Sequence, residues 1–270
     1  MTPLFQLCTF FTDEEEYRRL RASAREAGFV EPETFFTGLD NSGGNRFDPY
    51  QSLPELAASS PAEYLLCAHQ DVRFDRGDGR GRLLAALDEL SQLAPDWAVC
   101  GNAGLTSGLE VAARITDPGA ADLRIGPFPR QVISLDENLL VLRTGASPTL
   151  SRELRGFHFY GTDLCLHGEA RGRSAWVVDF HITHLSSGKI TPHFLESREA
   201  FRRRWSPHFR FRFVQTTCAI LFLSRHPWLA RLMNSRRVLH RMTFNRHFRR
   251  GMLALQARLQ PSAAMGTPWE

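Results

Sequence analysis

Short apolar runs alternate with helix-forming segments through the first 200 residues, and this alternation constrains the fold more than any other feature. Between the runs lie segments with helical periodicity or turn residues. A chain in which strands and helices alternate folds into a mostly parallel β-sheet with helices on both faces. We therefore predict an α/β, Rossmann-like fold. The runs are Leu4–Phe11, Glu33–Leu39, Tyr64–Ala68, Trp97–Gly101 and Ala175–His184.

Size and composition agree with a folded α/β protein. The chain has 270 residues, of which 43% are hydrophobic, enough for a sizeable core, and its length fits one large domain or a domain plus an appendage. It has five cysteines, an odd number without C-x-x-C spacing, so we expect reduced and mostly buried thiols. The longest later apolar run, Cys218–Leu223, is far shorter than the roughly 18 residues of a membrane span. The start of the chain does not resemble a secretory signal, and we expect a cytoplasmic protein.

Charge is distributed unevenly. Residues 1–199 contain 19 basic and 28 acidic side chains, whereas residues 200–270 contain 14 arginines and one acid, Glu270. Beyond Pro192 the pattern turns helical and basic, which predicts a main domain over residues 1–205 and a basic helical C-terminal extension over 206–270. Such an asymmetry concerns partners rather than fold. The extension could pack against the acidic body, contact phosphates of an acceptor, or lie peripherally on the anionic inner face of a membrane. Nucleic acid is the less favoured partner, because no recognisable binding motif accompanies the arginines.

Three polar clusters follow apolar runs or open a helix. His69-Gln70-Asp71 ends the run Tyr64–Ala68, "YGTDLCL" starts at Tyr160, and "HITHLSSG" starts at His181. Ligands of α/β proteins bind at the carboxyl ends of parallel strands, where such residues would lie. Each cluster also has an ordinary structural explanation. His69-Gln70-Asp71 could simply open a loop, and an acid such as Asp163 suits any helix start.

The order and spacing of these pieces resemble family 2 glycosyltransferases of the GT-A fold, most closely the branch with H-Q-D in place of the acidic D-x-D. The resemblance covers roughly residues 4–205 and fades beyond. It implies a GT-A-like fold and transfer of a sugar from a nucleoside-diphosphate sugar to an acceptor, with inversion. It also implies a divalent metal, Mn²⁺ or Mg²⁺, which would stabilise negative charge on the diphosphate.

The resemblance assigns roles to several residues. Asp71 would bind the metal, and Asp163 would be the general base that accepts the proton of the acceptor hydroxyl. Asp40 resembles the acid that recognises the nucleoside, although the sequence around it is also a common turn formula. The residues expected to bind the nucleotide sugar are Asp40, Asn41, His69, Gln70 and Asp71.

His184 is the second expected metal ligand. If Ala175–His184 is one strand, strict alternation puts His184 on the same face as Phe180 and Ile182, where that face reaches the rim of the sheet. His181 would then point the opposite way. The competing explanation is a histidine that belongs to the core.

Two other classes of function stay open. The chain could be a non-catalytic binding protein that docks through its basic extension, or a metal-dependent hydrolase or nucleotidyltransferase with the same edge site. An expected hairpin between Gln131–Ser134 and Leu139–Leu142, around Asp136-Glu137-Asn138, has no assigned role.

Overall fold

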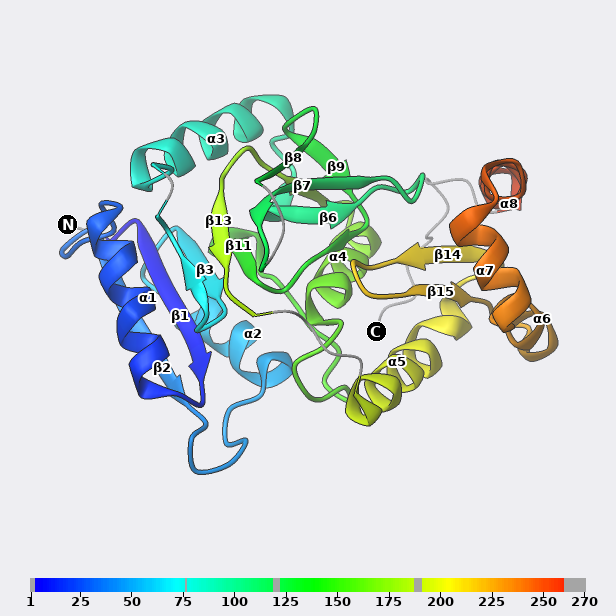
Figure 1. The fold of residues 1–270 in the computed structure, drawn as a ribbon, viewed down its shortest axis with the longest axis horizontal. Coiled ribbons are helices and arrows are strands. Elements are labelled where there is room, and N and C mark those ends of the chain that lie inside the picture. Colours follow the sequence, from blue (N-terminus) through cyan, green and yellow to red (C-terminus); the bar gives the residue numbers. More distant parts are fainter. Residues whose placement is uncertain (1–2, 76, 119–121, 187–190, 260–270) are drawn as a thin grey trace.

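The computed structural model describes residues 3–75, 77–118, 122–186 and 191–259, and it confirms the α/β class. A seven-stranded sheet forms the centre of the molecule (Figure 1). Its pairings orient five strands in one direction, with β11 and β9 antiparallel to them. In spatial order the strands are β2 (Thr34–Asp40), β1 (Phe5–Phe11), β3 (Tyr64–Ala68), β11 (Leu139–Arg143), β5 (Trp97–Gly101), β12 (Ser174–Val177) and β9 (Arg130–Val132).

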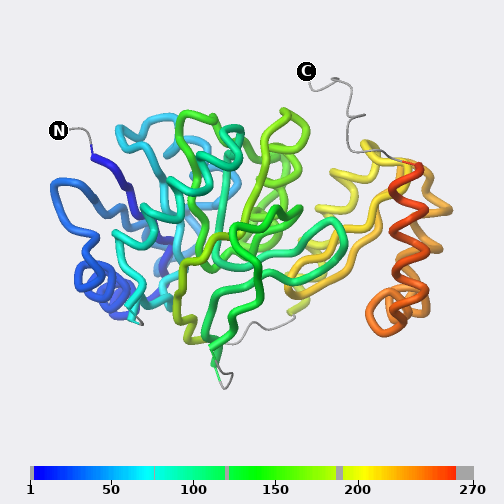
Figure 2. Tube along the Cα trace, turned by 90° about the horizontal axis from the view of Figure 1, so that it is seen from above, coloured from blue at the N-terminus to red at the C-terminus, as the bar shows by residue number. Residues whose placement is uncertain are grey.

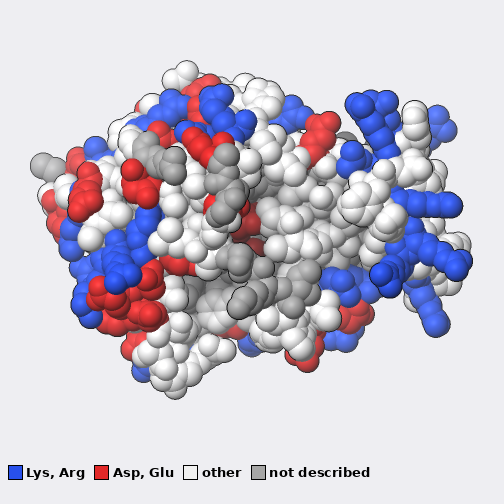
Figure 3. Space-filling model, viewed as in Figure 1, with Lys and Arg blue, Asp and Glu red and all other residues white. Residues whose placement is uncertain are grey.

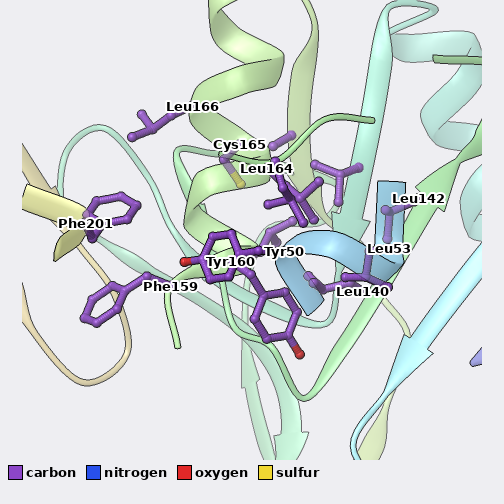
Figure 4. Packing of buried hydrophobic residues seen from close by; sticks show 14 of the residues in the cluster. Tyr50, Leu53, Leu140, Leu142, Phe159, Tyr160, Leu164, Cys165, Leu166 and Phe201 are labelled. Atoms are coloured by element: carbon purple, nitrogen blue, oxygen red, sulfur yellow. The ribbon is translucent and has the colours of Figure 1, made fainter. Parts of the chain in front are cut away.

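Helices cover both faces of this sheet. α1 (Glu14–Glu26) and α3 (Arg80–Leu93) pack on one face, and α2 (Pro49–Ser59), α4 (Tyr160–Ala170) and α5 (Pro192–Trp205) pack on the other. The sequence of β3 is continuously apolar because both faces of the strand are buried. Leu66 faces the layer of α1 and α3, whereas Leu65 and Cys67 face the layer of α2, α4 and α5. Figure 4 shows the latter layer, where Tyr160 and Leu164 of α4 meet Leu140 of β11.

The expected hairpin ending in Leu139–Leu142 is wrong. β11 instead lies between β3 and β5, with Leu139 opposite Ala68 and Leu140 opposite Gly101. An antiparallel strand begins at the edge where its parallel neighbours end. Asp136-Glu137-Asn138 therefore lies beside the end of β3, and the backbone N–H of His69 donates to the carbonyl oxygen of Asn138 at 3.0 Å.

The expected single strand Ala175–His184 is in fact two strands in different sheets. The chain leaves the large sheet after β12 and enters a second sheet as β13 (Ile182–His184). Val178, Phe180 and Ile182 are nevertheless all buried in the layer of α1 and α3, so alternation predicted their burial correctly. The other strands of the second sheet are β10 (Ser134–Leu135), β6 (Ala103–Leu105), β7 (Val111–Thr116), β8 (Leu123–Ile125) and β4 (Val72–Arg73).

The C-terminal extension is not helical throughout. It begins with a 3₁₀ turn (Ser206–His208) and a two-stranded hairpin of β14 (Arg212–Gln215) and β15 (Ile220–Leu223). Val214 and Leu221 pack into the main core, whereas Phe213 and Phe222 face a separate apolar cluster. The helices built on that cluster are α6 (Pro227–Met233), α7 (Arg236–Phe244) and α8 (Arg246–Leu259).

These helices form one end of the molecule, opposite α1 and β2 (Figures 1 and 2). In the described part of the chain, no helix has both the length and the apolar character that crossing a bilayer requires. Four cysteines are buried and unpaired, as expected, and Cys218 is exposed.

Candidate functional site

Three of the predicted residues converge at one edge of the large sheet. His69, Asp71 and His184 each offer a ligand atom, and these atoms lie within 4.8 Å of one another. Nε2 of His184 is 3.6 Å from Oδ2 of Asp71. All three side chains are partly exposed, so a solute can reach them. Two imidazoles and one carboxylate are a donor set that suits a divalent transition metal.

Strand pairing explains this convergence over more than a hundred residues. The chain turns after β3, where the N–H of Val72 donates to the carbonyl oxygen of His69, and continues as β4. β13 runs antiparallel to β4 and sets His184 opposite Val72. The N–H of Leu185 then donates to the carbonyl oxygen of Asp71 at 3.0 Å. The site therefore depends on the backbone register of two short strands.

Asp117 orients the His184 ring, and sequence reasoning missed it. β7 runs parallel to β13 with Thr116 opposite Thr183, so the next residues, Asp117 and His184, lie side by side. Nδ1 of His184 is 3.1 Å from Oδ1 of Asp117. In the tautomer that carries its proton on Nδ1, the ring donates a hydrogen bond to this carboxylate and turns the lone pair of Nε2 toward Asp71.

The surroundings of His69 favour its neutral form. Its pKa is lowered by burial and by His184, against the opposing effect of Asp71. The hydroxyl of Tyr160, at the start of α4, lies 3.5 Å from Nε2 of His69. A neutral imidazole retains the lone pair that a metal needs.

Glu137 is a second carboxylate near this edge that sequence reasoning left without a role. Its Oε1 accepts a hydrogen bond from the backbone N–H of Gly161 at 3.2 Å, and its carbonyl oxygen accepts one from Tyr160 at 3.3 Å. Burial, followed by the charge of Asp136, raises the pKa of Glu137 to about 8. With this pKa the carboxyl group is mostly protonated at pH 7, and its deprotonated form, the one able to accept a proton, becomes abundant only as pH rises.

Asp163 has different neighbours. Its side chain is fully buried, and its carboxylate accepts hydrogen bonds from Ser151 N at 2.7 Å, Ser151 Oγ at 2.9 Å and Trp205 Nε1 at 2.6 Å. Burial raises its pKa to about 6 against these donors. The role of general base stays a prediction. It requires this segment to open, because the carboxylate has no exposed surface here.

The remaining predicted residues, Gln70, Asp40 and Asn41, make hydrogen bonds that hold neighbouring loops in place. Oε1 of Gln70 accepts from the backbone N–H groups of Thr12 and Asp13 and thereby joins β3 to the start of α1. The other two close the loop after β2. Oδ1 of Asp40 accepts from the N–H and the hydroxyl of Ser42, which lowers its pKa, and Asn41 exchanges two hydrogen bonds with the backbone of Phe47.

Asp40 nonetheless lies at the same edge as the three converging residues. It is opposite Phe11 at the end of β1, which is the strand between β2 and β3. Two inter-strand spacings of about 4.8 Å put β2 about 10 Å from β3 across the sheet. Nucleotide binding by these residues stays a prediction.

Comparison with known proteins gives a relative and two distant structural neighbours. No known family model matches the chain. It is 33% identical over 216 residues to a Fuscovulum blasticum protein named "ATP synthase subunits region ORF 6", a match covering 76% of this chain and 86% of the relative. Two solved structures share 10% identity: A197 from STIV, over 68% of this chain and 86% of that chain with a TM-score of 0.39, and S. aureus TarS residues 1–349 in complex with UDP-GlcNAc, over 74% and 65% with a TM-score of 0.46. These scores are too low to carry a functional argument.

Proposed function

Because this chain belongs to the family of the Fuscovulum blasticum protein named "ATP synthase subunits region ORF 6", whose name gives no reaction, we propose a function from the site itself. The protein transfers a sugar from a nucleoside-diphosphate sugar to an acceptor hydroxyl, with a divalent cation bound by His69, Asp71 and His184. The observation that supports this most is the convergence of these three side chains at the sheet edge.

The donor set favours Mn²⁺ over Mg²⁺. Mg²⁺ is bound mostly by oxygen ligands and water, whereas imidazole nitrogens are suited to transition metals. When bound, the cation would supply Lewis-acid stabilisation of the charge that develops on the departing diphosphate. Asp117 would hold the His184 ring in position, and the three ligands would leave room for phosphate oxygens because each is partly exposed.

The position of the site supports a nucleotide-linked donor. A diphosphate near Asp71 lets a nucleoside extend along the edge toward Asp40, which lies two strands away in the sheet. His69, Gln70 and Asn41 would line this path. The carboxylate of Asp40 suits ribose hydroxyls, which can donate hydrogen bonds to it.

Transfer also needs a group that accepts a proton. The bond between the anomeric carbon and the diphosphate oxygen breaks, the acceptor oxygen bonds to that carbon, and the hydroxyl proton passes to a carboxylate. Asp163 is the residue that the resemblance assigns. Glu137 is a rival supported by its contact with the start of α4 beside His69, and its pKa of about 8 means that it could act as a base only in the deprotonated fraction, which grows as pH rises.

A thermal-shift panel tests the proposal. We expect a nucleoside diphosphate to raise the melting temperature in the presence of Mn²⁺ and not in its absence, because the cation bridges protein and phosphate. Asp71→Asn should lose this shift. His193→Asn should keep it, because that histidine is exposed at 60% of its side chain and lies outside the cluster.

Product analysis separates the competing functions. Incubation with a nucleotide sugar and Mn²⁺ should release nucleoside diphosphate faster when an acceptor is added. Equal release without acceptor would indicate a hydrolase. A protein that binds no nucleotide with any divalent metal would contradict sugar transfer and favour a binding role.

A further inference from the structure

The helices α6, α7 and α8 expose large apolar side chains to solvent. Trp228 is 69% exposed and Leu232 is 51% exposed, and they lie one helical turn apart on the same side of α6. Phe244, the last residue of α7, is 75% exposed, and Leu259 at the end of α8 is 45% exposed. Single exposed apolar residues are common, but several of this size on adjoining short helices mark an interaction surface.

The same elements carry a strong positive charge. Residues 206–259 contain eleven arginines and no acidic residue. Among the described residues, Arg212 is the arginine of this stretch that forms an ion pair, with Glu169 on α4. In Figure 3 this end of the molecule is blue and white, and the red acidic patches lie elsewhere. The exposed arginines of α6–α8 are Arg231, Arg236, Arg237, Arg241, Arg246, Arg250 and Arg258.

This arrangement does not fit packing of the extension against the acidic body. The extension is attached to the body through the apolar hairpin β14–β15, and its arginines on α6–α8 remain exposed. Charge and apolar surface are therefore both available to a partner.

We propose that α6, α7 and α8 dock on an anionic lipid bilayer. Trp228, Leu232 and Phe244 enter the boundary between headgroups and acyl chains, and the neighbouring arginines bind lipid phosphates. Trp, Phe and Leu beside arginine are the residues that interfacial helices use, and arginine can keep its charge in the headgroup layer while its stem lies along apolar surface. The proposal is independent of the sugar-transfer proposal, because it needs no nucleotide or metal.

A bilayer fits better than a nucleic acid. Stacking on bases uses aromatic rings, so it would leave the aliphatic side chains Leu232, Leu255 and Leu259 exposed in the complex. Burial in a bilayer interface removes aromatic and aliphatic surface from water alike.

Vesicle co-sedimentation of the full chain tests the proposal. We expect binding to phosphatidylcholine vesicles that contain phosphatidylglycerol and little binding to phosphatidylcholine alone. The variant Arg236→Gln/Arg237→Gln/Arg241→Gln should bind about 100-fold more weakly, because each arginine near an anionic surface contributes a factor of about five. The matched control Arg18→Gln/Arg19→Gln/Arg152→Gln, on exposed arginines of the body, should bind like the unmodified chain.

Apolar insertion has its own readout. Trp228→Ser/Leu232→Ser should weaken vesicle binding at least about tenfold, whereas Leu93→Ser, at a 59% exposed leucine of α3, should not. Brominated acyl chains should quench the tryptophan fluorescence of the bound protein, and Trp228→Phe should bind normally with most of this quenching lost.

The proposal is overturned if anionic vesicles do not bind the folded chain, or if both arginine variants bind equally well. If the chain does not bind vesicles but binds a single-stranded oligonucleotide tightly and in a salt-sensitive way, the surface is a nucleic-acid binding site instead.

Discussion

At the scale of single residues, metal binding at the candidate site depends on the protonation of its two histidines, because only an unprotonated ring nitrogen can bind a cation. Asp117 accepts from Nδ1 of His184 and so leaves Nε2 as the metal-facing atom. Burial lowers the pKa of His69 and so favours its neutral form. Neither property can be read from H-Q-D or from "HITH" alone, because each is created by neighbours that are distant in sequence.

Removing Asp117 should weaken metal binding without unfolding the protein. We expect Asp117→Ala to lower Mn²⁺ affinity about 10- to 100-fold, since loss of an orienting carboxylate typically has this effect. The side chain is 43% exposed, so stability should change little. Isothermal titration with Mn²⁺ measures the effect, with Glu55→Ala on the exposed side of α2 as the control. Unchanged affinity in Asp117→Ala would remove the proposed orienting role.

Glu137 gives a prediction about pH. Its folded-state pKa of about 8 lies above the ordinary value of about 4.3, so the folded protein holds this proton more tightly than the unfolded chain. The stabilisation is therefore complete at low pH and is lost as pH rises through about 8. Glu137→Gln, which stays neutral, should become more stable than the unmodified protein by about 2–4 kcal/mol at pH 9. Urea unfolding at pH 5 and pH 9 measures this, and a pH-independent difference between the two proteins would contradict it.

At the scale of elements, a buried polar network joins α4 to α5. Asp163 of α4 accepts hydrogen bonds from Trp205 at the end of α5 and from Ser151, whose Oγ is 3.1 Å from Nε2 of His167. Burial, together with Arg204 and Arg171, lowers the pKa of His167 to about 4, so this histidine is neutral at pH 7. A buried carboxylate with three donors fixes the relative position of the elements that it connects.

Asp163→Asn distinguishes this structural role from the predicted catalytic one. An amide nitrogen cannot accept a hydrogen bond, so at least one donor from Ser151 or Trp205 loses its partner. We expect a loss of about 1–3 kcal/mol in the free energy of unfolding, measured by urea denaturation with Glu55→Gln, at an exposed position of α2, as comparison. Full stability with abolished sugar transfer would instead support Asp163 as the base.

The elements also show what periodicity can and cannot predict. The runs that became β1, β2, β3 and β5 were predicted because burial on two faces requires continuous apolar sequence. The same pattern does not specify a partner, so β11 was assigned to a hairpin although it pairs in the centre of the sheet. The hairpin β14–β15 was missed because its arginines and aromatics resemble an amphipathic helix.

At the scale of the whole molecule, the candidate metal site and the basic end belong to different parts of one fold. Asp71 and His184 could be proposed as metal ligands from sequence, and His69 as a nucleotide-sugar contact, since each follows or ends an apolar run. Asp117 and Glu137 could not, because the register of β7 with β13 and of β11 with β3 places them, and that register is set by long-range packing. The basic extension lies at the opposite end of the molecule from α1 and β2. The hairpin β14–β15 joins it to the body, with one face packed in the main core and the other in the separate apolar cluster of α6–α8.

The central claim is that His69, Asp71 and His184 bind one divalent cation. Its most direct test is a titration of the metal-free protein with Mn²⁺, followed by electron paramagnetic resonance. We predict one bound Mn²⁺ per chain, lost in His184→Ala and in Asp71→Asn and retained in His193→Ala. Saturation at one ion that survives both His184→Ala and Asp71→Asn, or no binding by the intact folded chain, would contradict the account.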